Sequence, residues 1–172
     1  MKFQHPTAQD GAAIWTIVRD SGVLDLNSSY CYLMMGQYFS RSCIIARDEA
    51  TATVAGFIIG FRPPEDQQTL FVWQVAVSRD FQGQGIATRM LMHLLASQPQ
   101  DEVRFIEATI SPSNTASQAL FIGAAGKLAA EYSVADLFPA EWFPGGGVHE
   151  PEQRYRIGPF TTIPESVLGG HK

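Results

Sequence analysis

The pattern of apolar and polar positions is most informative over residues 70–95. Residues 70–77 form an almost continuous apolar run rich in β-branched and aromatic side chains, which is typical of a strand buried on both faces. A polar turn with two glycines, Gly83 and Gly85, comes next. Apolar residues then recur at helical spacing, at Ile86, Met90, Leu91 and Leu94. The pattern predicts a strand, a glycine turn and a helix in direct succession.

The other elements follow from the same rules. We expect a first strand over residues 3–6 and a helix that begins at the capping-box spacing Thr7-x-x-Asp10 and ends at Ser21-Gly22. The elements predicted elsewhere are, in order, a helix at 32–39, strands at 42–47 and 54–61, a strand at 103–110, a helix capped by Ser113 or Asn114, a long loop at 137–147 and a strand at 155–157. This order predicts one α/β (α+β) domain over residues 1–160 and a disordered tail at 161–172.

The composition is that of an ordinary globular protein. The chain has 172 residues, of which 17% are charged and 45% hydrophobic. Its net charge is −5 and it has no basic cluster, which argues against nucleic acid as a partner. We find no signal-peptide pattern and no apolar stretch of the roughly 18 residues that span a membrane, so we expect a cytoplasmic protein without a membrane partner. Cys31 and Cys43 lack the spacing of a disulfide scaffold or a metal site, and no metal is expected.

The glycine turn has the properties of an anion site. The first turn of a helix has backbone N–H groups without internal acceptors and carries the positive end of the helix dipole. Glycine at positions 83 and 85 lets a diphosphate approach the backbone and permits positive φ. Two common phosphate loops do not fit, because Gly85 is followed by Ile86 instead of the Lys-Ser/Thr of a Walker loop, and a dinucleotide fingerprint needs a third glycine.

The motif Gln82-x-x-Gly85-x-Ala87, between a strand and an amphipathic helix, resembles the signature of the GNAT superfamily of N-acetyltransferases, whose loop holds the pyrophosphate of acetyl-CoA. The resemblance implies a single-domain GNAT fold, with a mixed, mostly antiparallel sheet of about six to seven strands and about four flanking helices. It also implies acetyl-CoA as cosubstrate and a homodimer. The residues that it implies for acetyl-CoA binding are Val75, Ala76, Val77, Gln82, Gly83, Gln84, Gly85, Ile86, Ala87, Thr88, Asn114 and Phe121.

Further blocks are similar to the L-2,4-diaminobutyrate acetyltransferase family of ectoine biosynthesis. These blocks are residues 25–32 (DLNSSYCY), 62–64, 69–77 and 107–109, Ser113-Asn114 and His149-Glu150. The resemblance implies transfer of an acetyl group to the γ-amine of L-2,4-diaminobutyrate, by direct attack of the amine on the thioester through a tetrahedral intermediate. Two alternatives stay open: the same chemistry on another small diamino acid or a polyamine, and a CoA-binding sensor domain without catalysis.

Acidic residues are needed because the amine must lose a proton. An alkylammonium has a pKa near 10.4, so a neutral amine at pH 7 costs about 4 to 5 kcal/mol. A nearby carboxylate either accepts the proton or holds an ammonium group as its counter-ion. Asp25 and Glu150 are the candidates, one as anchor of the α-ammonium and the other beside the reacting γ-amine, in either assignment. The alternative roles are a helix cap for Asp25 and a solvated loop residue for Glu150.

The resemblance assigns roles to further residues. Trp73 and Gln74 lie on the strand that carries the thioester, with side chains on opposite faces, so one of them should contact the substrate. The backbone N–H of Val75 is the implied donor to the thioester carbonyl, and Val77 the implied partner of the pantetheine arm. The catalytic group is therefore Asp25, Trp73, Val75 and Glu150. The substrate-binding group is Asp25, Asn27, Ser28, Tyr30, Tyr32, Trp73, Gln74, His149 and Glu150.

One position departs from the superfamily pattern. Many members have a tyrosine seven residues after the asparagine that opens the fourth helix, and its hydroxyl protonates the departing thiolate. Counting from Asn114 gives Phe121, which has no proton to donate. Either a tyrosine such as Tyr30, Tyr32 or Tyr38 takes this role, or CoA leaves as a thiolate without help, since a simple thiol has a pKa near 8.5.

The two carboxylates make a first prediction. Replacing Asp25 and Glu150, each by Ala and by the matching amide, should lower kcat where the carboxylate accepts the proton and raise KM where it anchors the substrate. Steady-state kinetics that measure kcat and KM separately test this. Unchanged kinetics in all four variants would contradict the assignment of both residues.

Overall fold

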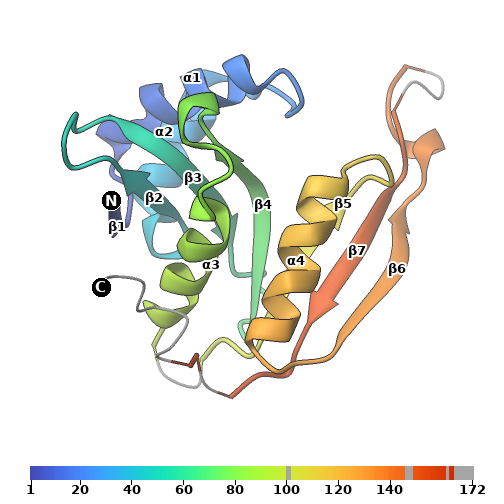
Figure 1. Ribbon diagram of the computed structural model, residues 1–172. Helices are drawn as coiled ribbons and strands as arrows, with labels where there is room; N and C mark the ends of the chain where they lie inside the picture. Colours follow the sequence, from blue (N-terminus) through green and yellow to red (C-terminus); the bar gives the residue numbers. More distant parts are fainter. Residues whose placement is uncertain (100–101, 146–148, 162, 165–172) are drawn as a thin grey trace.

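The computed structural model describes residues 1–99, 102–145, 149–161, 163 and 164. In these residues the strands and helices alternate much as the sequence predicts (Figure 1). The elements are β1 (Lys2–Gln4), α1 (Gly11–Ser21), α2 (Ser29–Tyr38), β2 (Ile44–Arg47), β3 (Val54–Phe61), β4 (Thr69–Val77), α3 (Ile86–Ala96), β5 (Phe105–Ile110), α4 (Thr115–Lys127), β6 (Tyr132–Phe138) and β7 (Glu152–Ile157), with short 3-10 helices η1 (Ala8–Asp10), η2 (Ser40–Ser42), η3 (Arg79–Phe81) and η4 (Ala140–Trp142).

All seven strands of the described chain form one sheet, in the order β1-β2-β3-β4-β5-β7-β6. Only the pair β4 and β5 is parallel, and the other neighbours are antiparallel. The sheet is therefore mixed and mostly antiparallel, as predicted. It divides into an N-terminal half, β1 to β4, and a C-terminal half, β5 to β7, which meet at the parallel pair (Figure 1).

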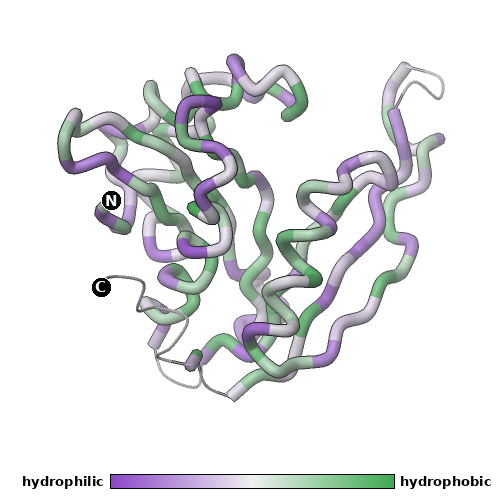
Figure 2. The backbone as a smooth tube through the Cα atoms, in the orientation of Figure 1, coloured by the Kyte–Doolittle hydropathy of each residue, from purple (hydrophilic) through white to green (hydrophobic). Residues whose placement is uncertain are grey.

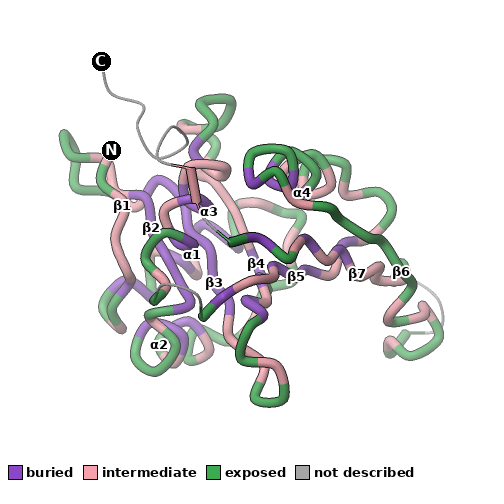
Figure 3. Tube along the Cα trace, turned by 90° about the horizontal axis from the view of Figure 1, so that it is seen from below, coloured by how far each residue is buried: buried purple, intermediate pink, exposed green. Residues whose placement is uncertain are grey.

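Two apolar clusters hold the helices against the sheet. The smaller cluster joins α1 and α2 to one face of the N-terminal half, through residues such as Ile14, Tyr32 and Phe57. The larger cluster joins α3 and α4 to the opposite face, through residues such as Met90 and Phe121. Hydrophobic positions follow the central strands in Figure 2, and buried positions concentrate in β2, β3 and α3 in Figure 3. Because both faces are covered there, the N-terminal half is the rigid base of the molecule.

Local signals in the sequence explain where the helices begin and end. Thr7 and Asp10 form the predicted capping box at the start of η1, which leads directly into α1. Gly22 ends α1 in the left-handed conformation, with φ of 67°. The side chain of Asn114 caps α4 by accepting a hydrogen bond from the Ser117 N–H at 3.1 Å.

The parallel pair β4 and β5 separates part of the way along its length. The strands are paired from Thr69 with Phe105 to Val72 with Ala108, and the remaining residues of β4 have no strand neighbour on that side. Figure 1 shows the two strands diverging towards the top of the view. β3 stays paired with β4 as far as Val77, so the N-terminal half remains intact where the two halves part.

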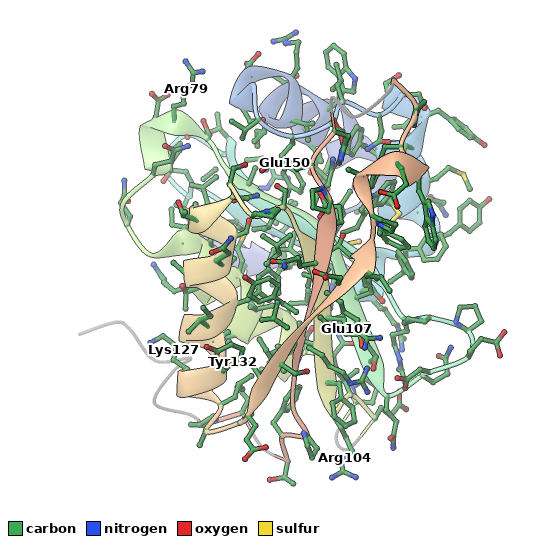
Figure 4. The ribbon with its side chains drawn as sticks, turned by 90° about the vertical axis from the view of Figure 1, so that its right-hand side faces the viewer. Arg79, Arg104, Glu107, Lys127, Tyr132 and Glu150 are labelled. Carbon is green, nitrogen blue, oxygen red and sulfur yellow. The ribbon has the colours of Figure 1, made fainter. Side chains whose placement is uncertain are left out.

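A polar cluster around Arg156 fixes the paired end of these strands. The Arg156 guanidinium on β7 forms an ion pair with Glu107 on β5, and donates a hydrogen bond to the Thr69 hydroxyl on β4 at 3.1 Å. It also lies 3.4 Å from the Asp66 carboxylate and stacks 3.9 Å above the Phe105 ring. In Figure 4, Glu107 and Arg104 lie well below Glu150, so this cluster and the site described below are at opposite ends of the C-terminal half.

Two details of the predicted elements were wrong. Strand β6 was assigned partly to a loop, because six of its seven residues are exposed and it has no buried face to produce a pattern (Figure 3). Residues 70–77 are not all buried on both faces, since the second half of β4 loses its neighbour and is half-buried or exposed except at Gln74. The first difference concerns an exposed strand, and the second a strand that has lost its neighbour on one side.

The two cysteines, Phe160 and Ile163 pack in the two apolar clusters. Cys43 is fully buried, which raises the pKa of its thiol to about 12, and Cys31 is half-buried. Phe160 belongs to the larger apolar cluster and Ile163 still packs against it. A domain boundary at residue 160 and a tail over 161–172 stay predictions, and residues 162 and 165–172 lie outside the described part. Within that part, no helix is long and apolar enough to cross a membrane.

Gly60 provides a test of the β3–β4 pairing. A Cβ atom at this position would clash with the carbonyl oxygen of Phe71 on β4. Gly60→Ala should therefore destabilise the protein by about 1 to 3 kcal/mol, measured by urea denaturation. In α4, a Cβ on Gly123 would meet nothing within 4 Å, so Gly123→Ala is the matched control and should stabilise by about 0.5 to 1 kcal/mol. Equal stabilities of the two variants would contradict the close approach of the strands.

Candidate active site

The free edge of β4 presents backbone donors to the space between the two halves of the sheet. The N–H of Ser78 donates to the Ala55 carbonyl of β3 at 2.8 Å. Residues of an antiparallel pair alternate between those that bond to the partner strand and those that bond away from it. With the observed register, Val75 and Val77 direct their N–H groups away from β3, towards the side where β5 is no longer paired. These N–H groups are available to a ligand.

A bulge in β4 changes the direction of the side chains next to this edge. Ile59 pairs with Gln74 and Gly60 pairs with Val72, which leaves Trp73 without a partner. Strict alternation therefore fails at this point, and both Trp73 and Gln74 line the same cavity. That one of the two contacts the substrate stays a prediction: Trp73 is 41% exposed, whereas Gln74 is buried and its side chain is bonded to Tyr32 and Asp25.

The glycine turn forms the far end of the free edge. Gly83 and Gly85 have φ of 75° and 69°, and Gly85 is the N-cap of α3. A Cβ at either glycine would meet nothing within 4 Å, so the space over the turn is open. The Gln82 side chain donates to the Val77 carbonyl at 3.1 Å and so ties the turn to the end of β4. The turn and the first N–H groups of α3 suit an anion such as a diphosphate.

A cavity of about 850 Å³ lies where β4 and β5 separate. Its walls come from the loop between α1 and α2, from β4 and β5, from the start of α4, and from the segment that joins β6 to β7. Its lining includes Asp25, Asn27, Trp73, Gln74, Val75, Thr109, Ser117, Phe121, Phe143, His149, Glu150 and Glu152.

The lining of this cavity is acidic. Three carboxylates face it, from Asp25, Glu150 and Glu152, together with the imidazole of His149. Among the described residues that line it, none is a lysine or an arginine. The Glu150 carboxylate accepts a hydrogen bond from the Ser113 hydroxyl. Such a lining attracts cations and repels anions, so it suits a ligand with ammonium groups.

Glu152 differs from the other two carboxylates in its surroundings. Burial raises its pKa above the ordinary value, and the neighbouring charges of Asp25 and Glu150 act in the same direction. His149 and a hydrogen bond from the Thr109 side chain lower the pKa and offset only part of this effect. A carboxylate with a raised pKa is a stronger base, and it is held on a strand.

His149 connects the two sides of the cavity mouth. Its ring stacks on Phe143 with centroids 3.8 Å apart. Its Nδ1 lies 2.6 Å from the Glu150 carbonyl, which can only accept, so Nδ1 carries a proton. Its Nε2 lies 3.7 Å from the Asp25 carboxylate on the opposite loop. When the imidazole is protonated, this contact becomes an ion pair across the mouth.

Comparison with protein-family models matches residues 13–124 to the acetyltransferase (GNAT) family. The chain belongs to the GNAT family. The fold described above, with its single parallel pair, is therefore the GNAT fold that the sequence predicts.

Two L-2,4-diaminobutyric acid acetyltransferases are similar to this chain over most of its length. The L-2,4-diaminobutyric acid acetyltransferase of Oceanobacillus iheyensis is 45% identical over 158 residues, which cover 91% of this chain and 87% of that protein. The corresponding protein of Marinococcus halophilus is 46% identical over 159 residues, which cover 92% and 90%.

The chain is also similar to solved structures. Diaminobutyrate acetyltransferase EctA from Paenibacillus lautus, in complex with its substrate L-2,4-diaminobutyric acid and coenzyme A, is similar with a TM-score of 0.88 and 46% identity, over 94% of this chain and 96% of that one. A chain of the NatC complex bound to Gag peptide and CoA has a TM-score of 0.71 but only 16% identity, so it shares the fold alone.

The structure brings many of the predicted GNAT site residues together. Those that line the cavity are Asp25, Asn27, Trp73, Gln74, Val75, Asn114, Phe121, His149 and Glu150. Ala76, Val77, Gly83, Gln84, Gly85, Ile86, Ala87 and Thr88 continue along β4, the glycine turn and the first turn of α3, and Gln82 opens that turn. Ile86 is buried, so only its backbone is available to a ligand.

The predicted tyrosines and Ser28 do not line the cavity. Tyr32 is fully buried, and its hydroxyl donates to the Gln74 side chain at 3.1 Å. Tyr30 and Tyr38 are exposed, and Ser28 is the N-cap of α2. Among the described residues, no tyrosine lines the cavity beside Phe121.

Sequence reasoning missed Glu152 and its partner Thr109. The final strand was predicted only from residue 155, but β7 starts at Glu152. Residues 152–154 (EQR) are all polar, so no alternation of polar and apolar positions marked the start of the strand. Among the described residues, no group of three or more His, Cys, Asp or Glu side chains is arranged to hold a metal ion.

Glu152 makes a pH prediction. A carboxylate is a base only when it is ionised, and a raised pKa keeps Glu152 protonated further into the acidic range. In the wild type, kcat/KM for acetyl transfer should rise with pH through a pKa above 4.5, and Glu152→Gln should lose this limb and lower kcat by about 10²- to 10⁴-fold.

Stability gives the control for this variant. A raised pKa means that ionisation of Glu152 opposes folding as the pH rises through that value, so Glu152→Gln should keep or increase Tm at neutral pH. Glu65→Gln, at an exposed turn outside the cavity, should leave the pH profile unchanged. Wild-type kinetics in Glu152→Gln would exclude this residue as the base.

Proposed function

We propose that the protein is an acetyl-CoA-dependent N-acetyltransferase that transfers an acetyl group to the γ-amine of L-2,4-diaminobutyrate. The observation that carries the proposal is the cavity between β4 and β5, where three carboxylates and no described lysine or arginine face the free N–H of Val75. The diaminobutyric acid acetyltransferases that are about 45% identical over nine tenths of the chain support the choice of substrate. The product, N4-acetyl-L-2,4-diaminobutyrate, places the enzyme in ectoine biosynthesis.

The residues present fit acetyl-CoA. The open turn at Gly83 and Gly85 and the first N–H groups of α3 hold the pyrophosphate. The pantetheine arm pairs with Val77 in the way a neighbouring strand would. The Val77 N–H is free for this because β5 pairs with β4 only from Thr69 to Val72. Val75 donates its N–H to the thioester carbonyl, and such a donor is worth about 2.7 to 4 kcal/mol when it is aimed at the developing negative charge.

The carboxylates divide the work on the amine. Glu152 accepts the proton of the γ-ammonium, directly or through a water molecule, because it is held on β7 and burial raises the pKa of its carboxyl group. Asp25 and Glu150 are more exposed and hold the α-ammonium as counter-ions. Trp73, 41% exposed at the bulge, forms a wall of the amine pocket and provides an aromatic face for the cation.

The thiolate leaves without help from a tyrosine. Phe121 occupies the position from which a tyrosine hydroxyl would reach it, and Tyr32 already donates its proton to Gln74. A thiol pKa near 8.5 makes the thiolate a tolerable leaving group at neutral pH, so the missing hydroxyl slows the reaction less than it would for an alkoxide. Asn114 serves mainly as the cap of α4 at the cavity wall.

The biological setting belongs to the same proposal. A cytoplasmic enzyme fits a biosynthetic use of acetyl-CoA and two thiols that are both free. A homodimer is expected, and sedimentation at micromolar concentration tests it. The two alternatives are transfer to another small diamino acid or a polyamine, and a CoA-binding sensor without turnover.

One assay separates the three functions. Thiol release from acetyl-CoA should be fastest with L-2,4-diaminobutyrate, and at least about tenfold slower in kcat/KM with ornithine, lysine or putrescine, because these amines have a longer chain or lack the carboxylate of diaminobutyrate. A polyamine or longer diamino acid as the best substrate would contradict the proposal. CoA binding without turnover of any amine would favour the sensor.

A further inference from the structure

A buried hydrogen-bond network connects the substrate side of the cavity to β4. The Tyr32 hydroxyl donates to the Gln74 side-chain oxygen at 3.1 Å and accepts from the backbone and side-chain N–H groups of Asn27, both at 3.4 Å. The Gln74 side-chain nitrogen donates to the carbonyl of Asp25 at 2.8 Å. Together these four bonds close a ring from the loop between α1 and α2, through α2, to β4.

The two side chains at the centre of the network, Tyr32 and Gln74, are buried and paired. Tyr32 is 0% exposed and Gln74 is 6% exposed. No buried side-chain nitrogen or oxygen in the described residues lacks a partner. Replacing one member therefore leaves its partners without hydrogen bonds in a buried position, which is more costly than losing a bond at the surface.

The Asp25 segment depends on this network for its position. The Asp25 side chain is 91% exposed, and within the described part of the chain its one ionic contact is with His149 at 3.7 Å. Its backbone, by contrast, is held by the Gln74 amide, and the backbone two residues later is held by the Tyr32 hydroxyl. The carboxylate is thus placed through its backbone, since its side-chain contact across the cavity mouth is long.

Gln74 directly precedes Val75 in the chain, and the N–H of Val75 points away from β3 at the free edge of β4. The Gln74 side chain holds the Asp25 segment, and the peptide bond between Gln74 and Val75 leads to the N–H that donates to the thioester carbonyl. These two groups therefore set the distance between the Asp25 segment and that N–H.

We infer that Tyr32 and Gln74 are positioning residues that determine which of the two amines of the substrate is acetylated. By fixing the Asp25 segment relative to Val75, they hold the α-ammonium away from the thioester and present the γ-amine to it. A displacement of about 1 Å in such an arrangement can change a rate by 10²-fold. This inference rests on the proposed function and concerns residues that do not touch the reacting atoms themselves.

Tyr32→Phe is the direct test, because it removes one oxygen atom and keeps the ring that fills the core. With L-2,4-diaminobutyrate, kcat should fall by about 10- to 100-fold while KM for acetyl-CoA stays within about twofold. The fraction of product acetylated on the α-amine, measured by NMR, should rise. Tyr132→Phe, the same change at an exposed position on β6, is the control and should match the wild type.

Two further measurements separate positioning from a general loss of structure. Gln74→Leu should produce the same change in product ratio, and the double variant should be no worse than the single ones, because both break one network. Hydrogen exchange of the backbone amides at residues 23–28 should become faster in Tyr32→Phe, while α3 is unaffected. A lower Tm with an unchanged product ratio would overturn the inference and leave Tyr32 as a core residue.

The outcomes distinguish this inference from the proposed function. A wild type that acetylates diaminobutyrate, together with a Tyr32→Phe enzyme of equal kcat and product ratio, overturns the inference alone. A wild type that does not acetylate diaminobutyrate overturns the proposed function and the control of amine choice with it. Unchanged exchange at residues 23–28 overturns the claim that the network fixes the segment, whatever the substrate.

Discussion

The end of pairing between β4 and β5 is the constraint on which the rest of the structure depends. The two parallel strands share four residue pairs and then separate, and the N–H groups of Val75 and Val77 are left without a strand partner. Backbone donors inside a protein are nearly always paired, so a sheet that opens at its centre needs something to occupy the gap. The Arg156 cluster holds the paired end closed, and the two apolar clusters keep each half of the sheet intact while the other end is open.

The opening divides the chemistry between the two halves of the sheet. The N-terminal half is covered on both faces and provides rigid elements: the free edge of β4, the glycine turn and the first turn of α3. The C-terminal half and its loops provide most of the charge, through Glu150, Glu152 and His149. In a site built in this way, the part that binds acetyl-CoA can stay the same while the part that binds the acceptor changes. This is consistent with one fold serving proteins that are only 16% identical.

The acidic lining is unfavourable for folding by itself. Three carboxylates around one cavity repel each other, and burial of Glu152 raises its pKa further. A substrate with two ammonium groups relieves this repulsion when it binds. The same feature therefore selects the substrate and makes the acetylated product, which has one positive charge fewer, bind less well.

How much was predictable depends on how local each signal is. The sequence by itself determined the glycine turn at Gly83 and Gly85, the capping box at Thr7 and the family, because these depend on backbone conformation and on residues close together in the chain. The resemblance in the sequence also selected Asp25 and Glu150, which line one cavity in the structure, while their roles stay predictions. Only the tertiary structure decided that the pairing of β4 with β3 is interrupted at Trp73, since a bulge is a relation between two strands.

The same limit applies to the residues that sequence reasoning missed or placed differently. Glu152 becomes a candidate base only because β7 lies beside β5 and because burial changes its pKa, and neither fact is written in its neighbours along the chain. Tyr32 was expected to contact the substrate. In the structure its side chain is buried, and its hydroxyl forms a hydrogen bond with Gln74, which is 42 residues away along the chain. Long-range packing sets burial and pairing, and burial and pairing decide what a side chain can do.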